Sequence, residues 1–302
     1  MAIGDLHHVE SGNCEDLYYV DVGLFDTPEY GSVYLLDAER PAVVDTGTGA
    51  NYEVVLDGLA ELGVAPEDLA AIAVTHVHLD HAGGAGYLAR ECENASVVVY
   101  ERGARHLADP SRLVAGTKQV VGDRWRHYAD PLPIDEDRMT VVDDGDVVDL
   151  GDHQLEVHRA PGHAPHQVVF FDPANDAVFT ADAAGIYVPS QDTVEPTTPP
   201  VNFDLDQSLA DVEMLRSLDP EVLLYGHFGD APAAARLTEY AETLSAWVEE
   251  IRAVRERLGD DEAVVEHFVE RTEMADAWGD EQARIEAELN VRGVLVALDR
   301  EK

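Results

Sequence analysis

"VTHVHLDHAGG", residues 74–84, decides the fold, because it gathers three histidines and one aspartate directly after an apolar run. In an extended segment, alternate side chains point to the same side, so His76 and His78 can reach one metal ion. Asp80 and His81 follow where glycines indicate that the strand has ended, and a turn there can aim them at a second ion about 3.5–4 Å away. A pair of exposed loop histidines is the plainer alternative, but four ligand types together favour a metal site.

Three further candidate ligands stand where other apolar runs close. His163 follows a Pro-Gly turn in "RAPGHAPHQ", Asp182 ends "FTAD", and His227 ends "LLYGH". Loops beyond strand ends, held by a rigid sheet, are where binding sites are usually built. We therefore expect these side chains to lie near the first group.

The order of elements indicates an α/β protein with two similar halves. Short apolar runs separated by Pro, Gly and Asp predict antiparallel strands in the first 50 residues. Helical spacing follows over residues 51–62, with Gly63 as its stop, and a strand, a helix and another strand come next. Strands return between residues 139 and 180, and a helix over residues 207–218 leads to the strand that ends in His227.

Two segments do not fit this alternation. Residues 101–138 are helical and irregular, and an insertion of this length is often a lid or a binding wall. Its Trp125, His127 and Tyr128 either close over a substrate or fill the insertion's own core. From residue 231 onward the pattern is helical, so we expect a catalytic domain over residues 1–230 and a packed helical extension over 231–302.

The composition is strongly acidic. Sixty-one acidic against 20 basic residues give a formal net charge of -41, while 45% hydrophobic residues among 302 allow a substantial core. Such a surface repels itself unless salt screens it, which predicts a halophilic source; a basic partner is the weaker alternative, since the carboxylates are spread along the whole chain.

The cysteine content and the lengths of the apolar runs indicate the cellular location of the protein. Cys14 and Cys92 are too few for a disulfide framework or a cysteine metal cluster, and reduced intracellular thiols fit best. The first residues lack the pattern of an export signal, and no apolar run reaches the length of a membrane span. We expect a soluble, cytoplasmic protein.

The pattern His76-x-His78-x-Asp80-His81, followed by His163, Asp182 and His227, resembles the metallo-β-lactamase fold superfamily, and in particular its metallo-hydrolases of the glyoxalase II and lactonase kind. The resemblance spans roughly residues 15–230 and includes "VVDTG" with Asp45. It implies an αββα four-layer sandwich with a dinuclear metal site at one edge, here carrying the C-terminal helical extension.

The resemblance also implies how the ligands divide. One metal would be held by His76, His78 and His163, the other by Asp80, His81 and His227. Asp182 would bridge them, and Asp45 would support the ligand loop by hydrogen bonds. The cofactors are therefore two divalent cations, with zinc expected first and iron or manganese also accepted by such ligands.

The implied activity is that of a metallo-hydrolase acting on a small-molecule substrate. A metal-bridging hydroxide would attack the carbonyl of a small ester, thioester or lactone, and Asp80 would orient it and accept its proton. Tyr187, five residues past Asp182, either donates a proton and binds the substrate carbonyl or merely packs. His166 either contacts substrate or is a hydrogen-bonded structural histidine.

Other functions of the same fold agree less well with the ligand set. A mononuclear iron persulfide dioxygenase uses a subset comparable to His76, His163 and Asp182, and the complete second set argues against it. A flavodiiron oxygen reductase has Glu where this chain has His78. An RNA or DNA phosphodiesterase would need a basic patch, which the sequence lacks, and a non-catalytic scaffold would be expected to lose a ligand. The terminal helices either form a homodimer surface or shape the pocket rim.

Overall fold

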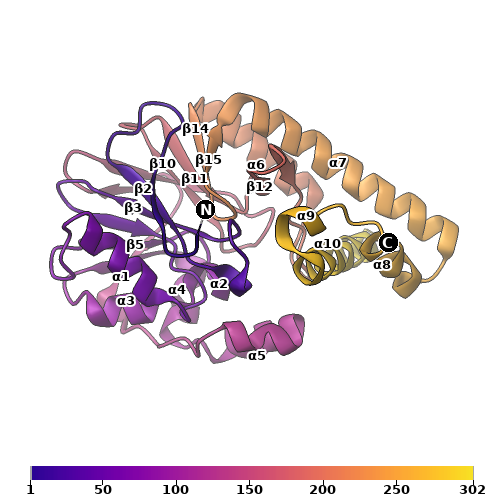
Figure 1. Cartoon of the computed structure of the whole chain (residues 1–302), viewed down its shortest axis with the longest axis horizontal. Coiled ribbons are helices and arrows are strands. Elements are labelled where there is room, and N and C mark those ends of the chain that lie inside the picture. Colours follow the sequence, from indigo (N-terminus) through magenta and orange to yellow (C-terminus); the bar gives the residue numbers. More distant parts are fainter. Residues whose placement is uncertain (1, 302) are drawn as a thin grey trace.

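Two β-sheets face each other in the computed structural model, which describes residues 2–301 (Figure 1). The first sheet follows the chain in order, from β1 (Leu6–His8) through β2 (Leu17–Asp21), β3 (Ser32–Leu36), β4 (Ala42–Val44), β5 (Ala71–Val74) and β6 (Ser96–Tyr100) to β7 (Met139–Val142). Its first four strands pair antiparallel, as predicted, and the pairs from β4 to β7 are parallel.

The second sheet comes from the second half of the chain. Its order is β15 (Asp230–Pro232), β14 (Val222–Tyr225), β11 (Ala177–Ala181), β10 (Val168–Asp172), β9 (Gln154–Arg159) and β8 (Val147–Asp149). Only β11 and β14 pair parallel, and they are neighbours. A separate ribbon pairs β12 (Ile186–Val188) with β13 (Thr193–Glu195).

Three apolar cores separate four layers. Between the sheets lie side chains of both, including Tyr34 and Phe179. The outer face of the first sheet packs with Leu59 of α1 (Tyr52–Glu61) and Leu88 of α3 (Ala85–Glu91). The outer face of the second sheet packs with α6 (Leu205–Leu218) and α7 (Ala233–Leu258). The expected αββα sandwich is thus confirmed.

Local signals explain where the helices begin and end. The helix predicted over residues 51–62 is α1, and Gly63 adopts a φ of 79° just beyond it, a conformation that favours glycine. The helix predicted from residue 207 begins earlier, at Leu205, because the Asp204 carboxylate accepts a hydrogen bond from the Gln207 backbone N–H at 3.0 Å.

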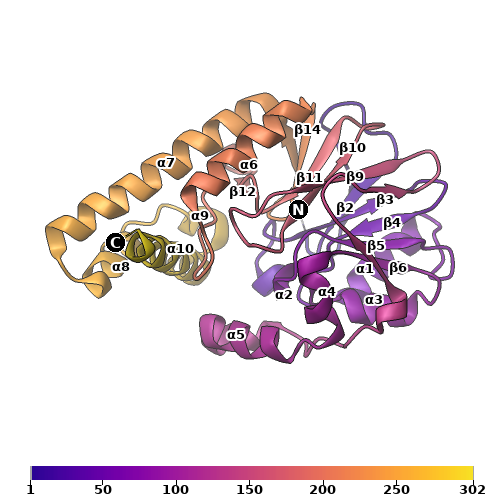
Figure 2. The same ribbon diagram turned by 180° about the vertical axis from the view of Figure 1, so that it is seen from behind.

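The insertion consists of α4 (Glu101–Ala108), α5 (Ser111–Val121) and two 3-10 helices, η2 (Gly122–His127) and η3 (Glu136–Arg138). No residue of α5 is buried, so this helix builds no core of its own, and Figure 2 shows it projecting from the sandwich. After it, the Thr48 hydroxyl donates to the His127 carbonyl at 2.9 Å. The insertion is therefore tied to the loop that follows β4.

The C-terminal extension continues through α7 into α8 (Asp261–Val269), α9 (Ala275–Trp278) and α10 (Asp280–Arg300). The predicted boundary at residues 230 and 231 falls inside β15, because the second sheet includes residues up to Pro232. A Cβ on Gly293 of α10 would lie 1.7 Å from the Thr198 carbonyl oxygen, so this helix packs tightly on the body. None of the helices within residues 2–301 combines the length and apolar character that a membrane span requires.

Candidate metal centre

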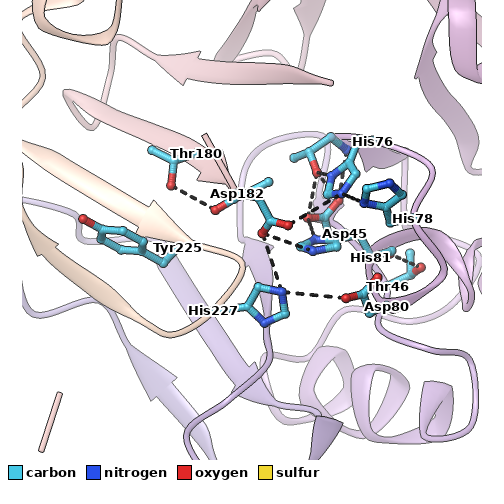
Figure 3. A network of polar contacts seen from close by, with 12 residues as sticks. Asp45, Thr46, His76, His78, Asp80, His81, Thr180, Asp182, Tyr225 and His227 are labelled. Carbon is cyan, nitrogen blue, oxygen red and sulfur yellow. Dashed lines mark hydrogen bonds and ion pairs between the residues drawn. The ribbon is translucent and has the colours of Figure 1, made fainter. Parts of the chain in front are cut away.

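The candidate ligands gather at one edge of the sandwich, where several strands end (Figure 3). His76 and His78 follow β5, and His78 precedes the short helix α2 (Leu79–Ala82), which carries Asp80 and His81. His163 lies between β9 and β10, Asp182 directly follows β11, and His227 follows β14. Because β11 and β14 are parallel neighbours, their carboxyl ends bring Asp182 and His227 together.

Four of these side chains form a first group: His76, His78, His163 and Asp182. Each offers a ligand atom, and these atoms lie within 4.8 Å of one another. The Nδ1 atom of His78 lies 3.0 Å from His76 Nε2 and 3.1 Å from His163 Nε2. The His163 Nε2 atom is also 3.1 Å from Asp182 Oδ2.

Asp80, His81 and His227 form a second group that meets the same distance criterion. Asp182 lies between the two groups: its Oδ2 faces the first, and its Oδ1 is 3.4 Å from His81 Nε2 and 3.5 Å from His227 Nε2. His227 Nε2 is in turn 3.9 Å from Asp80 Oδ2. The structure thus brings together all seven side chains that the sequence singled out.

Two of the candidate ligand atoms lack hydrogen-bond partners, as expected of atoms that bind metal ions. The His81 Nε2 and Asp182 Oδ1 atoms are buried and make no hydrogen bond. Buried polar atoms in folded proteins are normally satisfied, so such orphans call for a ligand. Imidazole nitrogens and carboxylate oxygens are a donor set that suits zinc, iron or manganese.

Asp45 holds the loop that carries the first histidines. Its Oδ2 is 2.9 Å from His81 Nδ1, and its Oδ1 accepts the backbone N–H of Thr75 at 2.9 Å. The Thr75 hydroxyl also donates to this carboxylate at 2.8 Å. With its Nδ1 engaged by a carboxylate, the His81 ring presents Nε2 to Asp182, an arrangement typical of metal-ligating histidines.

The other two loops are supported in the same way by more distant elements. The Nδ1 of His227 donates to the Tyr30 carbonyl at 2.8 Å, and the Nδ1 of His163 is 3.3 Å from the Thr197 hydroxyl. Both supports are anchored on α10. The Tyr30 hydroxyl donates to Glu286 at 2.5 Å, and the Asn290 side-chain oxygen accepts the backbone N–H of Thr198, next to Thr197, at 2.5 Å.

Two glycines permit the close packing of these loops. A Cβ on Gly226 would lie 2.6 Å from the Cε1 atom of His81, and one on Gly162 would lie 2.4 Å from backbone atoms of Ser208. Real Cβ atoms do not approach other atoms so closely, so a larger residue would displace the ring of His81 or the turn before His163.

Burial and neighbouring charges set the protonation of the centre. Burial lowers the pKa of His76 well below its usual value, with His81 and His78 adding to the effect, and burial lowers the pKa of His163 to about 4. Burial opposes ionisation of Asp182, but the surrounding histidines hold its pKa well below the usual range. His81 differs: burial opposes its charged form, but Asp182 and Asp45 raise its pKa well above the usual value. Neutral His76 and His163 beside an ionised Asp182 are in the protonation states that metal binding requires, and a metal at His81 would displace its proton.

Two further candidates have different surroundings. The Tyr187 hydroxyl donates to Asp192 at 2.9 Å, and its ring stacks on Tyr225 at 5.6 Å, so none of these contacts reaches a candidate ligand. Its proton-donor role stays a prediction that this geometry does not support. The Nδ1 of His166 accepts the Val77 backbone N–H at 3.4 Å, which favours the structural interpretation of that histidine.

Sequence reasoning missed the residues that support the centre. Tyr30 stands 197 positions from His227, and Thr197 stands 34 positions from His163. Neither of them belongs to a local motif, and a single sequence carries no signal for pairs so far apart. Only the fold identifies them.

A family model described as the metallo-beta-lactamase superfamily matches residues 26–227. The metallo-beta-lactamase fold-containing protein ST1585 of Sulfurisphaera tokodaii is 28% identical over 221 residues, which cover 72% of this chain and 79% of that protein. Its crystal structure superposes with a TM-score of 0.70 at 24% identity, covering 96% of this chain and all of the other.

Several relatives have names that describe hydrolysis. The acyl-coenzyme A thioesterase MBLAC2 of Gallus gallus is 27% identical over 187 residues, 55% of this chain and 62% of that protein. The hydroxyacylglutathione hydrolase of Maricaulis maris is 27% identical over 146 residues, 48% of this chain and 43% of that protein.

Proposed function

The chain belongs to the metallo-beta-lactamase superfamily, and from that premise we propose that it is a dinuclear metal-dependent hydrolase of small esters, thioesters or lactones. One observation carries the proposal: the two oxygens of Asp182 face two separate groups of candidate ligands. An iron dioxygenase would need the first group alone. The complete second group therefore favours a hydrolase.

The bound cations would supply the main chemical activation, lowering the pKa of a water molecule to about 7 and polarising the substrate carbonyl. His76, His78 and His163 would hold one ion, Asp80, His81 and His227 the other, and Asp182 both. Asp80 is the more open carboxylate, with 24% of its side chain exposed against 5% for Asp182. This exposure supports Asp80 as the group that would accept the proton of an attacking water.

Thioesters are the first substrates to test. Two hydrolases to which the chain is similar are named for acyl groups carried on coenzyme A and on glutathione. These similarities cover about half of this chain, so they support the class of bond and leave the acyl group open.

Elemental analysis combined with a substrate panel in molar salt tests the proposal. We expect two equivalents of a divalent metal per chain and hydrolysis of acyl thioesters that stops after chelation and returns with added metal. One equivalent of iron, with oxygen uptake on a persulfide, would establish the dioxygenase instead. Cleavage of phosphodiesters without cleavage of any acyl compound would establish the nuclease.

Several finer points stay predictions. They are zinc as the physiological metal, adaptation to high salt, a cytoplasmic location and a homodimer. Light scattering of the purified protein measures the oligomeric state, and stability at low and molar salt measures the adaptation.

A further inference from the structure

A buried arginine lies in the insertion, on η2. This residue, Arg124, is 7% exposed, although the chain has 20 basic against 61 acidic residues. Within residues 2–301, its guanidinium forms no ion pair with any carboxylate. A buried charge is normally paired, because its desolvation is costly.

The guanidinium is held in place, yet most of its donors stay open. Its carbon lies 3.7 Å from the centroid of the Phe25 ring, and Nη2 donates to the Gln282 side-chain oxygen at 2.7 Å. The Nε and Nη1 atoms make no hydrogen bond, and neither is among the fully enclosed polar atoms. These donors therefore border space that solvent can reach.

Ring contacts connect this arginine to the metal centre. The Phe25 ring lies 6.1 Å from that of Tyr30, and the Tyr30 ring lies 5.3 Å from that of His227. On the other side, Phe25 is 5.7 Å from Tyr128, whose pKa is raised by burial and by the charge of Asp80, while Arg124 opposes the shift. The charges of Arg124 and Asp80, together with that of Glu286, thus all reach this tyrosine.

We infer that Arg124 binds an anionic group of the substrate, a carboxylate or phosphate, while the scissile carbonyl lies at the metal centre. The guanidinium presents donors in a planar fork that matches such groups, and the bound anion would neutralise the buried charge. The inference rests on the proposed function and restricts it to anionic thioesters or esters. The anion belongs either to the acyl group or to the thiol carrier.

Matched substrates show whether the anion belongs to the acyl group or to the thiol carrier. Succinyl and butyryl thioesters of N-acetylcysteamine differ in the charge of the acyl group, and butyryl thioesters of glutathione and of N-acetylcysteamine differ in the charge of the carrier. In at least one pair, we expect Arg124→Gln to lower kcat/KM about 10- to 100-fold for the anionic member and to leave the neutral member unchanged. Arg124→Lys keeps the charge but lacks the planar fork of donors. Its kcat/KM for the anionic member should lie between those of the wild type and Arg124→Gln.

Arg126→Gln is the matched control. It removes a cation from the same 3-10 helix, but Arg126 is an exposed residue that lies 3.5 Å from Glu281. It should leave both pairs of substrates unchanged. Equal losses on anionic and neutral substrates in Arg124→Gln would mean a purely structural residue, and no loss on either would also overturn the inference.

A binding measurement separates this inference from the hydrolase proposal. Calorimetry of the metal-loaded protein with succinate, glutathione and butyrate needs no turnover. Wild-type protein should bind succinate or glutathione at least about tenfold more tightly than butyrate, and Arg124→Gln should remove that difference. If no thioester is cleaved but the difference is present, the hydrolase proposal fails and the anion site stands. If wild-type protein shows no preference, the anion site is wrong even where hydrolysis occurs.

Discussion

The molecule contains two buried clusters of histidine and aspartate, and they are built differently. In the metal centre, imidazole nitrogens face one another at 3.0–3.1 Å, and two polar atoms are left without hydrogen bonds. At a second cluster, His153 lies between two aspartates, with its Nδ1 2.9 Å from Asp172 and its Nε2 2.8 Å from Asp16. We call this second cluster the His153 clamp.

The clamp is complete without a ligand. The Asn175 amide donates to both Asp16 and Asp172 at 3.0 Å, and Asp172 also accepts the backbone N–H of Ala174 at 3.1 Å, so each carboxylate has at least two partners. Burial disfavours the charged imidazole, but Asp172 and Asp16 raise the pKa of His153 above its usual value. In the metal centre, burial instead lowers the pKa of His76 and His163, which keeps these imidazoles neutral and their lone pairs available, whereas Asp182 and Asp45 raise the pKa of His81.

The difference shows what distinguishes a site from a structural cluster. Both clusters use the same side-chain types, and both lie in buried surroundings. What differs is whether the donors and acceptors balance within the protein. In the metal centre, His81 Nε2 and Asp182 Oδ1 have no hydrogen-bond partner and can bind an ion. In the clamp, both ring nitrogens of His153 already have partners.

Removal of the shared carboxylate should produce the largest effect. Asp182→Ala deprives both groups of a ligand atom, so we expect it to lose most of its metal and to lower activity more than about 100-fold, beyond the loss typical of a supporting residue. Elemental analysis and kcat/KM measure this. Asp172→Asn in the clamp is the matched control and should keep its metal. Normal metal content in Asp182→Ala would contradict the bridging assignment.

Addition of a methyl group beside His81 should produce the second-largest effect. Gly226→Ala places a Cβ 2.6 Å from the Cε1 atom of His81, so the ring must shift from its position. We expect about 1–3 kcal/mol of lost stability and a clear loss of metal and activity. Gly116→Ala, in α5 with open space around it, should leave metal content and activity unchanged. Unchanged metal affinity in Gly226→Ala would show that the position of this ring is not critical.

Loss of a support on α10 should weaken the centre without removing a ligand. Asn290→Ala frees the backbone N–H of Thr198, next to the residue that contacts His163. We expect metal affinity to fall about tenfold, measured by competition with a chelator, and the cobalt-substituted spectrum to change. An unchanged spectrum and affinity would mean that the extension supports only the fold.

The His153 clamp should affect stability with a pH dependence of its own. Because the folded pKa of His153 is raised, its contribution is fully present below the unfolded pKa of about 6.5 and is lost as pH rises through the folded pKa. We therefore expect His153→Gln to cost about 2 kcal/mol near pH 6 and less at higher pH, measured by urea unfolding. His8→Gln, at an exposed position, is the control, and a cost that grows with pH would contradict the assignment.

The local patterns predicted much of the fold and the centre. Apolar runs predicted most strands of both sheets but not β1 or β15, and the dense motif at residues 74–84, with three later strand ends, predicted which side chains meet. The insertion and the supports were not predictable in the same way. Trp125 and Tyr128 stack at 5.2 Å in the structure, but α5 buries nothing, so the insertion's arrangement depends on its contacts with the loop after β4.

The chain by itself determined the chemistry available to the protein: which ligand types it carries, their spacing along the strands, and the charge of its surface, because these are properties of local sequence. Tertiary structure alone decided which histidine belongs to an open centre and which to a closed clamp, and which arginine is left buried without a carboxylate. Those outcomes depend on partners more than a hundred positions away, such as Asp16 for His153 at 137 and Gln282 for Arg124 at 158, and such pairs meet only when the sheets and helices pack.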